Sequence, residues 1–167
     1  MQKSYLFELI SLVNKVLSKN EVPVIVGSQA LFAQTDHPPL IVRESRECDF
    51  LLFDGKASER DTINREFGIF SSFAGEKGYY ADALGLATVV LPDGWQERLV
   101  PLVDPEGKVV AKCLDIYDLA ASKIAAGRPK DIEFLAFGFS ADLILVDLFL
   151  VRSLVLRSKL ENDALKE

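Results

Sequence analysis

Two acidic residues stand two positions apart in the segment Arg43-Glu-Ser-Arg-Glu-Cys-Asp-Phe50, which then turns apolar. Glu47 and Asp49 would open a strand, and residues i and i+2 of a strand point to the same face. Two carboxylates on one face repel each other unless a divalent cation lies between them. Mg²⁺ binds carboxylate oxygens together with substrate phosphates. The pair therefore predicts a metal site for phosphoryl transfer, and ordinary charges on an exposed strand edge are the alternative.

A glycine and a serine follow a short apolar run. Residues 22–26 predict a buried strand, Gly27-Ser28 ends it, and residues 29–34 predict the start of a helix. Such a junction presents free backbone N–H groups and a hydroxyl, which suit a phosphate. Glycine lets the phosphate approach, because a side chain would block it. A plain strand-to-helix turn is the alternative.

A third candidate group lies in the segment from Asp118 to Asp131. Lys123 stands on a predicted helix of otherwise small apolar residues, where its amine is a point charge that could reach a nucleotide phosphate. Arg128, Lys130 and Asp131 follow at the break before the next helix. Asp131 could instead cap that helix.

Together these motifs resemble the minimal nucleotidyltransferases of the polymerase-beta superfamily, over about residues 20 to 140. The motifs are Gly27-Ser28, Ser45-x-Glu47-x-Asp49 and Asp118-Leu-Ala-Ala-Ser-Lys123-x-Ala-Ala-Gly-Arg128-x-Lys-Asp131. The stretch from Ala87 to Pro101 is similar to a bacterial branch related to the AbiEii/AbiGii-type toxin nucleotidyltransferases.

The resemblance implies a role for each candidate residue. Gly27 and Ser28 would hold the triphosphate of an NTP, while Glu47 and Asp49 would hold Mg²⁺. Lys123, Arg128, Lys130 and Asp131 would bind or orient the nucleotide. The superfamily's usual pair is Asp-x-Asp, so Glu47 is one methylene longer than expected. Many members use a third carboxylate, and Asp82 in Tyr79-Tyr-Ala-Asp82 is the best-placed candidate.

Two functions follow as expectations. The first is a Mg²⁺-dependent enzyme that moves a nucleoside monophosphate from an NTP to a hydroxyl of RNA, protein or a small molecule. The toxin-like resemblance makes tRNA a reasonable first acceptor. The second is a non-catalytic, degenerate nucleotidyltransferase fold that works as a partner or antitoxin-like binding subunit, because folds host unrelated functions.

The periodicity of the remaining chain predicts an α/β (α+β) fold with a mixed, mostly antiparallel sheet flanked by helices. We expect one domain over residues 1–167, with a core at about 20–140 and C-terminal helices at about 130–160. Helices are predicted at 3–18, 58–67 with Ser58 as N-cap, 115–126, 130–137 and 140–160. Strands are predicted at 22–26, 47–53, 69–73, 78–82, 87–91, 97–103 and 109–113.

The net charge, the cysteine count and the hydropathy of the chain limit the classes of partner that we expect. The 167 residues carry a net charge of -6, which argues against a broad duplex-binding surface. Cys48 and Cys113 are too few for a disulfide framework, so we expect two buried thiols in a reducing cytosol. The most apolar segment, 141–156, is interrupted by charges and too short to span a bilayer comfortably. We therefore expect a cytoplasmic protein without a membrane partner.

Three further features complete the expectations. The predicted C-terminal helix is apolar nearly all round, which indicates a homodimer or a cognate partner there. His37, the only histidine, stands beside Pro38-Pro39 in a predicted loop and is expected to be solvated. Trp95 is expected to cover the edge of the core, with base stacking as the alternative.

Overall fold

The computed structural model describes residues 1–18, 21–53 and 55–164, with 157–164 described as backbone. The chain divides into two compact units. The first comprises Met1–Thr88 and Val100–Leu114, and the second comprises Val89–Leu99 and Asp115–Glu167. The prediction of a single domain over 1–167 stays a prediction.

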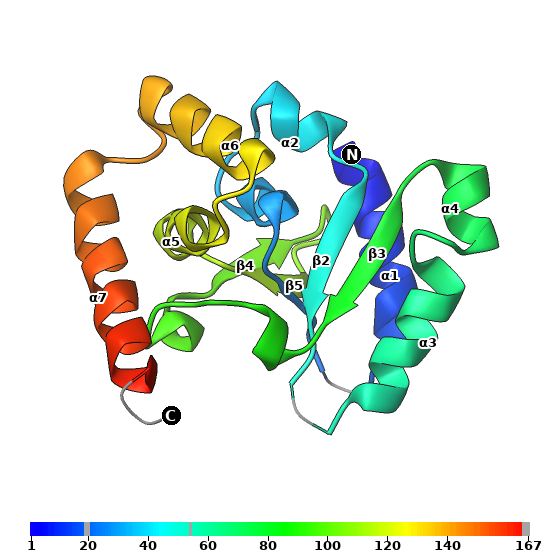
Figure 1. Cartoon of the computed structure of the whole chain (residues 1–167). Coiled ribbons are helices and arrows are strands. Elements are labelled where there is room, and N and C mark those ends of the chain that lie inside the picture. Colours follow the sequence, from blue (N-terminus) through cyan, green and yellow to red (C-terminus); the bar gives the residue numbers. More distant parts are fainter. Residues whose placement is uncertain (19–20, 54, 165–167) are drawn as a thin grey trace. The chain divides into compact units, whose positions relative to one another are not determined.

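A five-stranded mixed sheet forms the centre of the first unit (Figure 1). Its order is β3-β2-β1-β5-β4, and the strands are β1 (Val24–Ile25), β2 (Glu47–Leu51), β3 (Tyr80–Leu84), β4 (Val100–Val103) and β5 (Val109–Cys113). The pairs β1–β2 and β4–β5 are antiparallel, whereas β1–β5 and β2–β3 are parallel. The predicted α/β class is confirmed, but the sheet is evenly mixed rather than mostly antiparallel.

Helices of the first unit cover this sheet. They are α1 (Lys3–Val16), α2 (Leu40–Glu44), α3 (Ala57–Phe67) and α4 (Ser72–Lys77), with 3₁₀ helices η1 (Ser28–Ala33) and η2 (Leu86–Thr88). Helix α1 buries Leu6, Leu9, Ile10 and Val13, which is the i, i+3, i+4, i+7 spacing of one helical face. It contacts β5 and α3, and α3 in turn contacts β3. In Figure 1, α1, α3 and α4 lie together beside β2 and β3.

Strand β3 is an edge strand, and α3 holds its outer side. The Nδ2 of Asn64 donates to the carbonyl of Ala83 at 3.1 Å, and the Oδ1 of Asn64 accepts from the Ala83 amide at 2.8 Å. One side chain thus satisfies both backbone groups that an edge strand leaves unpaired at this residue. This pair of hydrogen bonds, which we call the Asn64 clamp, fixes β3, the strand that carries Asp82.

The second unit contains η3 (Trp95–Arg98) and the helices α5 (Ile116–Ala126), α6 (Pro129–Ser140) and α7 (Val146–Ala164). Helix α5 contacts both α6 and α7. Asp115 is its N-cap and accepts from the Asp118 amide, while Gly127 ends it at a φ of 62°. Pro129 then starts α6 at a position where a missing N–H costs nothing.

Several predicted elements are wrong. Residues 69–73 are not a strand, because the Ser71 hydroxyl accepts from the Ala74 amide and so caps α4. Residues 87–91 contain the end of η2 instead of a strand, and 97–103 begins within η3 before β4. The predicted helix at 29–34 is the 3₁₀ helix η1.

The helix boundaries also differ from the predictions. Helix α3 has Lys56 rather than Ser58 at its N-cap. The predicted helix at 140–160 is interrupted, because α6 runs to Ser140 and Asp142 adopts a φ of 53° before α7. Such a left-handed conformation cannot continue a helix.

Two further expectations concern the burial of the cysteines and the ability of any helix to span a membrane. Cys48 and Cys113 are free and fully buried, as predicted. Burial, together with nearby Asp49, raises the pKa of Cys48 well above its ordinary value. Among the described residues, no helix is both long and apolar enough to cross a bilayer.

Candidate active site

The two carboxylates of β2 share one face of the sheet. Along the strand, Glu47 and Asp49 are half-buried, while Cys48 and Phe50 between and after them are buried. This alternation is the period of two that the spacing predicts. The face opposite the packed core of β2 therefore presents two carboxyl groups.

The neighbouring strand adds a third carboxylate to the face. Strands β2 and β3 run parallel with Asp49 opposite Asp82 and Glu47 opposite Tyr80. The Tyr80 hydroxyl donates to Oε2 of Glu47 at 3.1 Å. Burial and the negative charges of Glu47, Asp82 and Asp49 raise the pKa of Tyr80 to about 12. The candidate third carboxylate thus lies on the strand next to the pair and in register with Asp49.

Gly27 lies directly against the Asp49 carboxylate. A Cβ at Gly27 would stand 1.6 Å from Oδ2 and 2.6 Å from Cγ of Asp49. The backbone holds this arrangement, because the Val26 amide donates to the Asp49 carbonyl at 3.0 Å. The φ of Gly27 is -93°, which any residue adopts, so glycine is required here for space alone.

Ser28 is half-buried and opens η1. The expected α-helix would have brought a macrodipole toward a phosphate. A six-residue 3₁₀ helix supplies much less of it. Because the Asp49 carboxylate fills the space beside Gly27, the hydroxyl of Ser28 remains the feature that suits a phosphate.

The donors of this face suit a hard cation. Carboxylate oxygens are the ligands that Mg²⁺ takes, and one or two of them suffice when substrate phosphates supply the rest. No three His, Cys, Asp or Glu side chains within the described ranges gather tightly enough to hold a metal ion by themselves. The Mg²⁺ site on this face therefore stays a prediction.

The basic candidates belong to the second unit, where Asp131 brings two of them together. Lys123 Nζ donates to Oδ1 of Asp131 at 2.8 Å, and Arg128 Nε donates to Oδ2 at 2.6 Å. The Asp131 side chain is fully buried and Lys123 is nearly so, with its amine 4.7 Å from the ring centre of Phe134. The Arg128 side chain is 60% exposed.

The contacts within this cluster bear on the roles predicted for Asp131 and Lys123. Burial would raise the pKa of Asp131, but the hydrogen bonds from Arg128 and Lys123 outweigh it and lower that pKa. The alternative role of Asp131 as N-cap is wrong, because Arg128 is the N-cap of α6. Lys123 forms a buried ion pair with Asp131, Arg128 pairs with the same carboxylate from an exposed position, and Lys130 is exposed.

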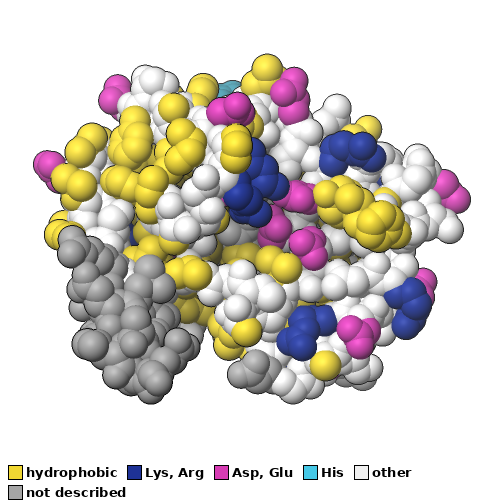
Figure 2. All heavy atoms as spheres, viewed as in Figure 1, with side chains coloured by type: hydrophobic (Ala, Val, Ile, Leu, Met, Phe, Trp, Pro, Cys, Tyr) yellow, Lys and Arg dark blue, Asp and Glu magenta, His cyan; other side chains and the backbone are white. Residues whose placement is uncertain are grey.

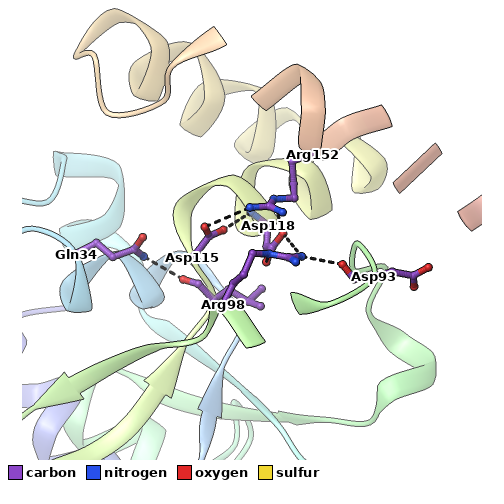
Figure 3. Close-up of polar contacts among 7 residues, drawn as sticks. Gln34, Asp93, Arg98, Asp115, Asp118 and Arg152 are labelled. Atoms are coloured by element: carbon purple, nitrogen blue, oxygen red, sulfur yellow. Dashed lines mark hydrogen bonds and ion pairs between the residues drawn. The ribbon is translucent and has the colours of Figure 1, made fainter. Parts of the chain in front are cut away.

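A second charged cluster, which the sequence did not reveal, surrounds Asp118 (Figure 3). Arg98 donates to Oδ2 through Nε at 2.8 Å and to Oδ1 through Nη2 at 2.9 Å. Arg152 of α7 pairs with Asp118 at 2.9 Å, and its guanidinium reaches Asp115 at 3.9 Å. Asp118 is fully buried, and this burial raises its pKa despite the two arginines. The one available signal was an arginine within an apolar helix, which is typical of a buried acidic partner.

The structure also shows the surroundings of the other residues that the sequence singled out. His37 is exposed and Trp95 is buried, in line with the readings favoured for both. Tyr79, next to Tyr80, donates to Oε2 of Glu8 at 2.6 Å and stacks on Tyr5. A shallow hollow of about 300 Å³ lies elsewhere in the first unit, between η1 and β4, and contains none of the candidate residues.

The mixed five-stranded sheet, with a Gly-Ser turn that ends β1 beside the carboxylates of β2, agrees with an α/β nucleotidyltransferase fold. A family model described as nucleotidyltransferase of unknown function (DUF6036) matches residues 4–159, and the chain belongs to this family. No curated protein and no solved structure matches the chain significantly. The relation to the AbiEii/AbiGii-type branch stays a prediction.

Proposed function

We propose that the protein is a Mg²⁺-dependent nucleotidyltransferase that transfers a nucleoside monophosphate from an NTP to an acceptor hydroxyl. The observation that carries the proposal is the contact of Gly27 with the Asp49 carboxylate, with Asp82 in register on the next strand. This contact packs the Asp49 carboxylate against a position that no side chain can share, so the acidic face of β2 adjoins the Gly27-Ser28 turn, where a cation and a polyphosphate would bind together.

The residues of the first unit take distinct roles in this proposal. Glu47 and Asp49 hold Mg²⁺, which neutralises charge on the transferring phosphoryl group when it is bound. Gly27 and Ser28 receive the triphosphate through backbone N–H groups and the Ser28 hydroxyl. Within the second unit, the Asp131 carboxylate holds the buried Lys123 and the exposed Arg128 together, and a role of Arg128 and Lys130 in nucleotide binding is tested by its own substitutions.

The reaction needs positioning more than covalent chemistry. The acceptor oxygen forms a bond to the α-phosphorus, and the bond from that phosphorus to the bridging oxygen of the β-phosphate breaks. Pyrophosphate leaves with the electron pair. Asp82 is the candidate base that takes the proton of the acceptor hydroxyl, since it is the third carboxylate on the face.

Label transfer tests the proposal. The protein is incubated with each α-labelled NTP, Mg²⁺ and either total RNA or a protein extract. Wild type should transfer label, and Asp49→Asn should lose at least about 100-fold of the rate, because an amide cannot replace a carboxylate that holds the cation. Glu66→Gln is the matched control, since Glu66 is an exposed carboxylate of α3 paired with Arg65.

The same experiment addresses the non-catalytic alternative. Wild-type protein that transfers no label with any NTP, and whose melting temperature no NTP raises, would contradict the enzyme and favour the binding subunit. Transfer that persists in Asp49→Asn would contradict the assigned site. Because the sequence resembles toxin nucleotidyltransferases, tRNA is our first acceptor to test, and growth arrest on expression is the test of a toxin-antitoxin role.

We also infer that a second copy of the chain binds through α7. Six large apolar side chains between Val146 and Val155 are exposed, which is unusual for the surface of a monomer. They are Val146, Leu148, Leu150, Val151, Leu154 and Val155. Figure 2 shows hydrophobic side chains gathered over α6 and the start of α7.

Light scattering after size exclusion tests this contact. Wild type should elute as a dimer at micromolar concentration, and Leu154→Lys should give a monomer because it places a charge in the apolar contact. Ile69→Lys, which charges an exposed apolar residue outside α7, should remain a dimer. A monomeric wild type would contradict the homodimer and leave a cognate protein as the alternative occupant.

A further inference from the structure

Glu47 is the longer of the two carboxylates on β2, and its position depends on one more rotatable bond than that of an aspartate. A half-buried glutamate loses considerable side-chain freedom when it is fixed. A cation site needs its ligands held in place before the cation arrives, and groups behind the ligands supply that order. The question is which side chain fixes Glu47.

Tyr80 is in position to do so. It stands opposite Glu47 on the neighbouring parallel strand, so the two side chains leave the sheet on the same face. Its hydroxyl donates to Oε2 of Glu47 at 3.1 Å, which fixes one oxygen of the carboxylate. The tyrosine ring has few rotatable bonds and is itself half-buried, so it is a rigid support.

The clamp on the edge strand supports the same geometry. Tyr80 begins β3, and Asn64 of α3 holds the backbone of Ala83 three residues later. The Tyr80 amide donates to the Arg46 carbonyl at 2.9 Å, directly before Glu47. The strand that carries the hydroxyl is therefore held close to β2 at the position of the glutamate.

We propose that Tyr80 is a positioning residue that orients Glu47 for cation binding at the nucleotide site. The inference rests on the proposed function, because it assumes that Glu47 is a cation ligand. It adds a residue to the site, because the Tyr80 hydroxyl fixes one oxygen of the Glu47 carboxylate.

Mn²⁺ binding measured by electron paramagnetic resonance, in the presence of a non-hydrolysable ATP analogue, tests the inference without relying on turnover. Tyr80→Phe removes only the hydroxyl and should weaken Mn²⁺ binding about 10-fold, the usual loss when a supporting partner of a metal ligand is removed. Tyr79→Phe is the matched control, because it removes a neighbouring hydroxyl that is bonded to a different glutamate, Glu8. Its Mn²⁺ affinity should equal that of wild type.

A double-mutant cycle separates positioning from a general loss of stability. Glu47→Asp shortens the carboxylate and withdraws it from Tyr80, so Tyr80→Phe should have no further effect on Mn²⁺ affinity in that background. An unchanged affinity in Tyr80→Phe alone, or an equal 10-fold loss in the Glu47→Asp background, would overturn the role of Tyr80 while the proposed function stands. Wild-type protein that binds no Mn²⁺ would overturn both.

Discussion

At the scale of single residues, the candidate site depends on the absence of a side chain at Gly27. The glycine has an ordinary φ, and its importance lies in the 1.6 Å that would separate a Cβ from Oδ2 of Asp49. A methyl group there must push the carboxylate aside, because the strand backbone on either side is held by hydrogen bonds.

Gly27→Ala should therefore damage binding more than stability. We expect nucleotide-dependent Mn²⁺ binding to fall at least about 10-fold, as for other disturbed metal ligands. The free energy of unfolding should fall by about 1–3 kcal/mol, typical of an overpacked site. Isothermal titration and urea denaturation measure the two effects. Gly75→Ala is the control, since Gly75 lies within α4 with open space around it and should gain up to about 1 kcal/mol.

Asp131 gives a prediction on the pH dependence of stability. Its pKa is lowered in the folded protein, so its contribution is complete above the ordinary aspartate pKa of about 3.9 and is lost as the pH falls below that value. Asp131→Asn leaves the buried Lys123 amine without its counter-charge and should cost about 3–5 kcal/mol at pH 7. Urea denaturation at pH 7 and below pH 4 should show that the mutant loses less additional stability in acid.

Two other aspartates, Asp118 and Asp36, serve as comparisons for this prediction. Asp118 has a raised pKa, so its proton is bound more readily in the folded state, and its contribution rises as the pH falls toward its ordinary pKa. The two buried aspartates thus act in opposite senses. Asp36→Asn is the control, since its pair with Lys3 is exposed and should matter by less than about 1 kcal/mol. An acid response of Asp131→Asn equal to that of wild type would contradict the assignment.

Part of the site could be predicted at this scale and part could not. The same-face position of Glu47 and Asp49 follows from strand spacing, because the period of two is local. The register of Asp49 with Asp82 and the bond from Tyr80 to Glu47 depend on how two distant strands pair, which spacing along one strand does not determine. The partners of Asp118 come from η3 and α7, so the chain order conceals them.

At the scale of elements, β3 depends on α3 as much as on its strand partner. Both Ala83 backbone groups bond to Asn64, so the outer edge of the sheet is closed by a side chain. The sequence predicted α3 from its periodicity, but nothing local indicates that Asn64 faces a strand.

Asn64→Ala should expose that edge. We expect a loss of about 1–3 kcal/mol in the free energy of unfolding, because two backbone groups lose their partners. Hydrogen exchange should show the Ala83 amide losing protection. Glu66→Ala, an exposed change on the same helix, should stay within about 0.5 kcal/mol of wild type. Unchanged protection at Ala83 in Asn64→Ala would contradict the clamp.

The segments whose secondary structure was predicted wrongly share one cause. The segment 69–73 contains Ile and Phe, which favour strands, yet Ser71 caps a helix within it. Glu97 and Arg98 belong to the 3₁₀ helix η3, which precedes β4 and which Gly94 opens with a φ of 73°. In both places a single capping or turn residue outweighed the apolar pattern, and long periodic segments such as α1 and β5 were predicted correctly.

At the scale of the whole molecule, the charge of -6 restricts which nucleic acids can be partners. Non-specific affinity for duplex DNA arises from basic side chains that neutralise phosphates. We expect a 30-base-pair duplex to show no binding below about 100 μM at physiological salt, weaker than the usual non-specific range. Fluorescence anisotropy measures it. Micromolar, salt-dependent binding would indicate a basic surface that the composition does not suggest.

The two natural cysteines allow the opening of the first unit's sheet to be followed with a thiol-specific reagent. Both thiols belong to strands of the central sheet, are fully buried, and are the only sulfhydryl groups of the chain. A thiol-specific reagent can therefore react only when the sheet opens, and its rate reports the frequency of that opening. Since Cys48 lies between Glu47 and Asp49, slower modification on addition of nucleotide and Mn²⁺ would record ligand binding from inside the sheet.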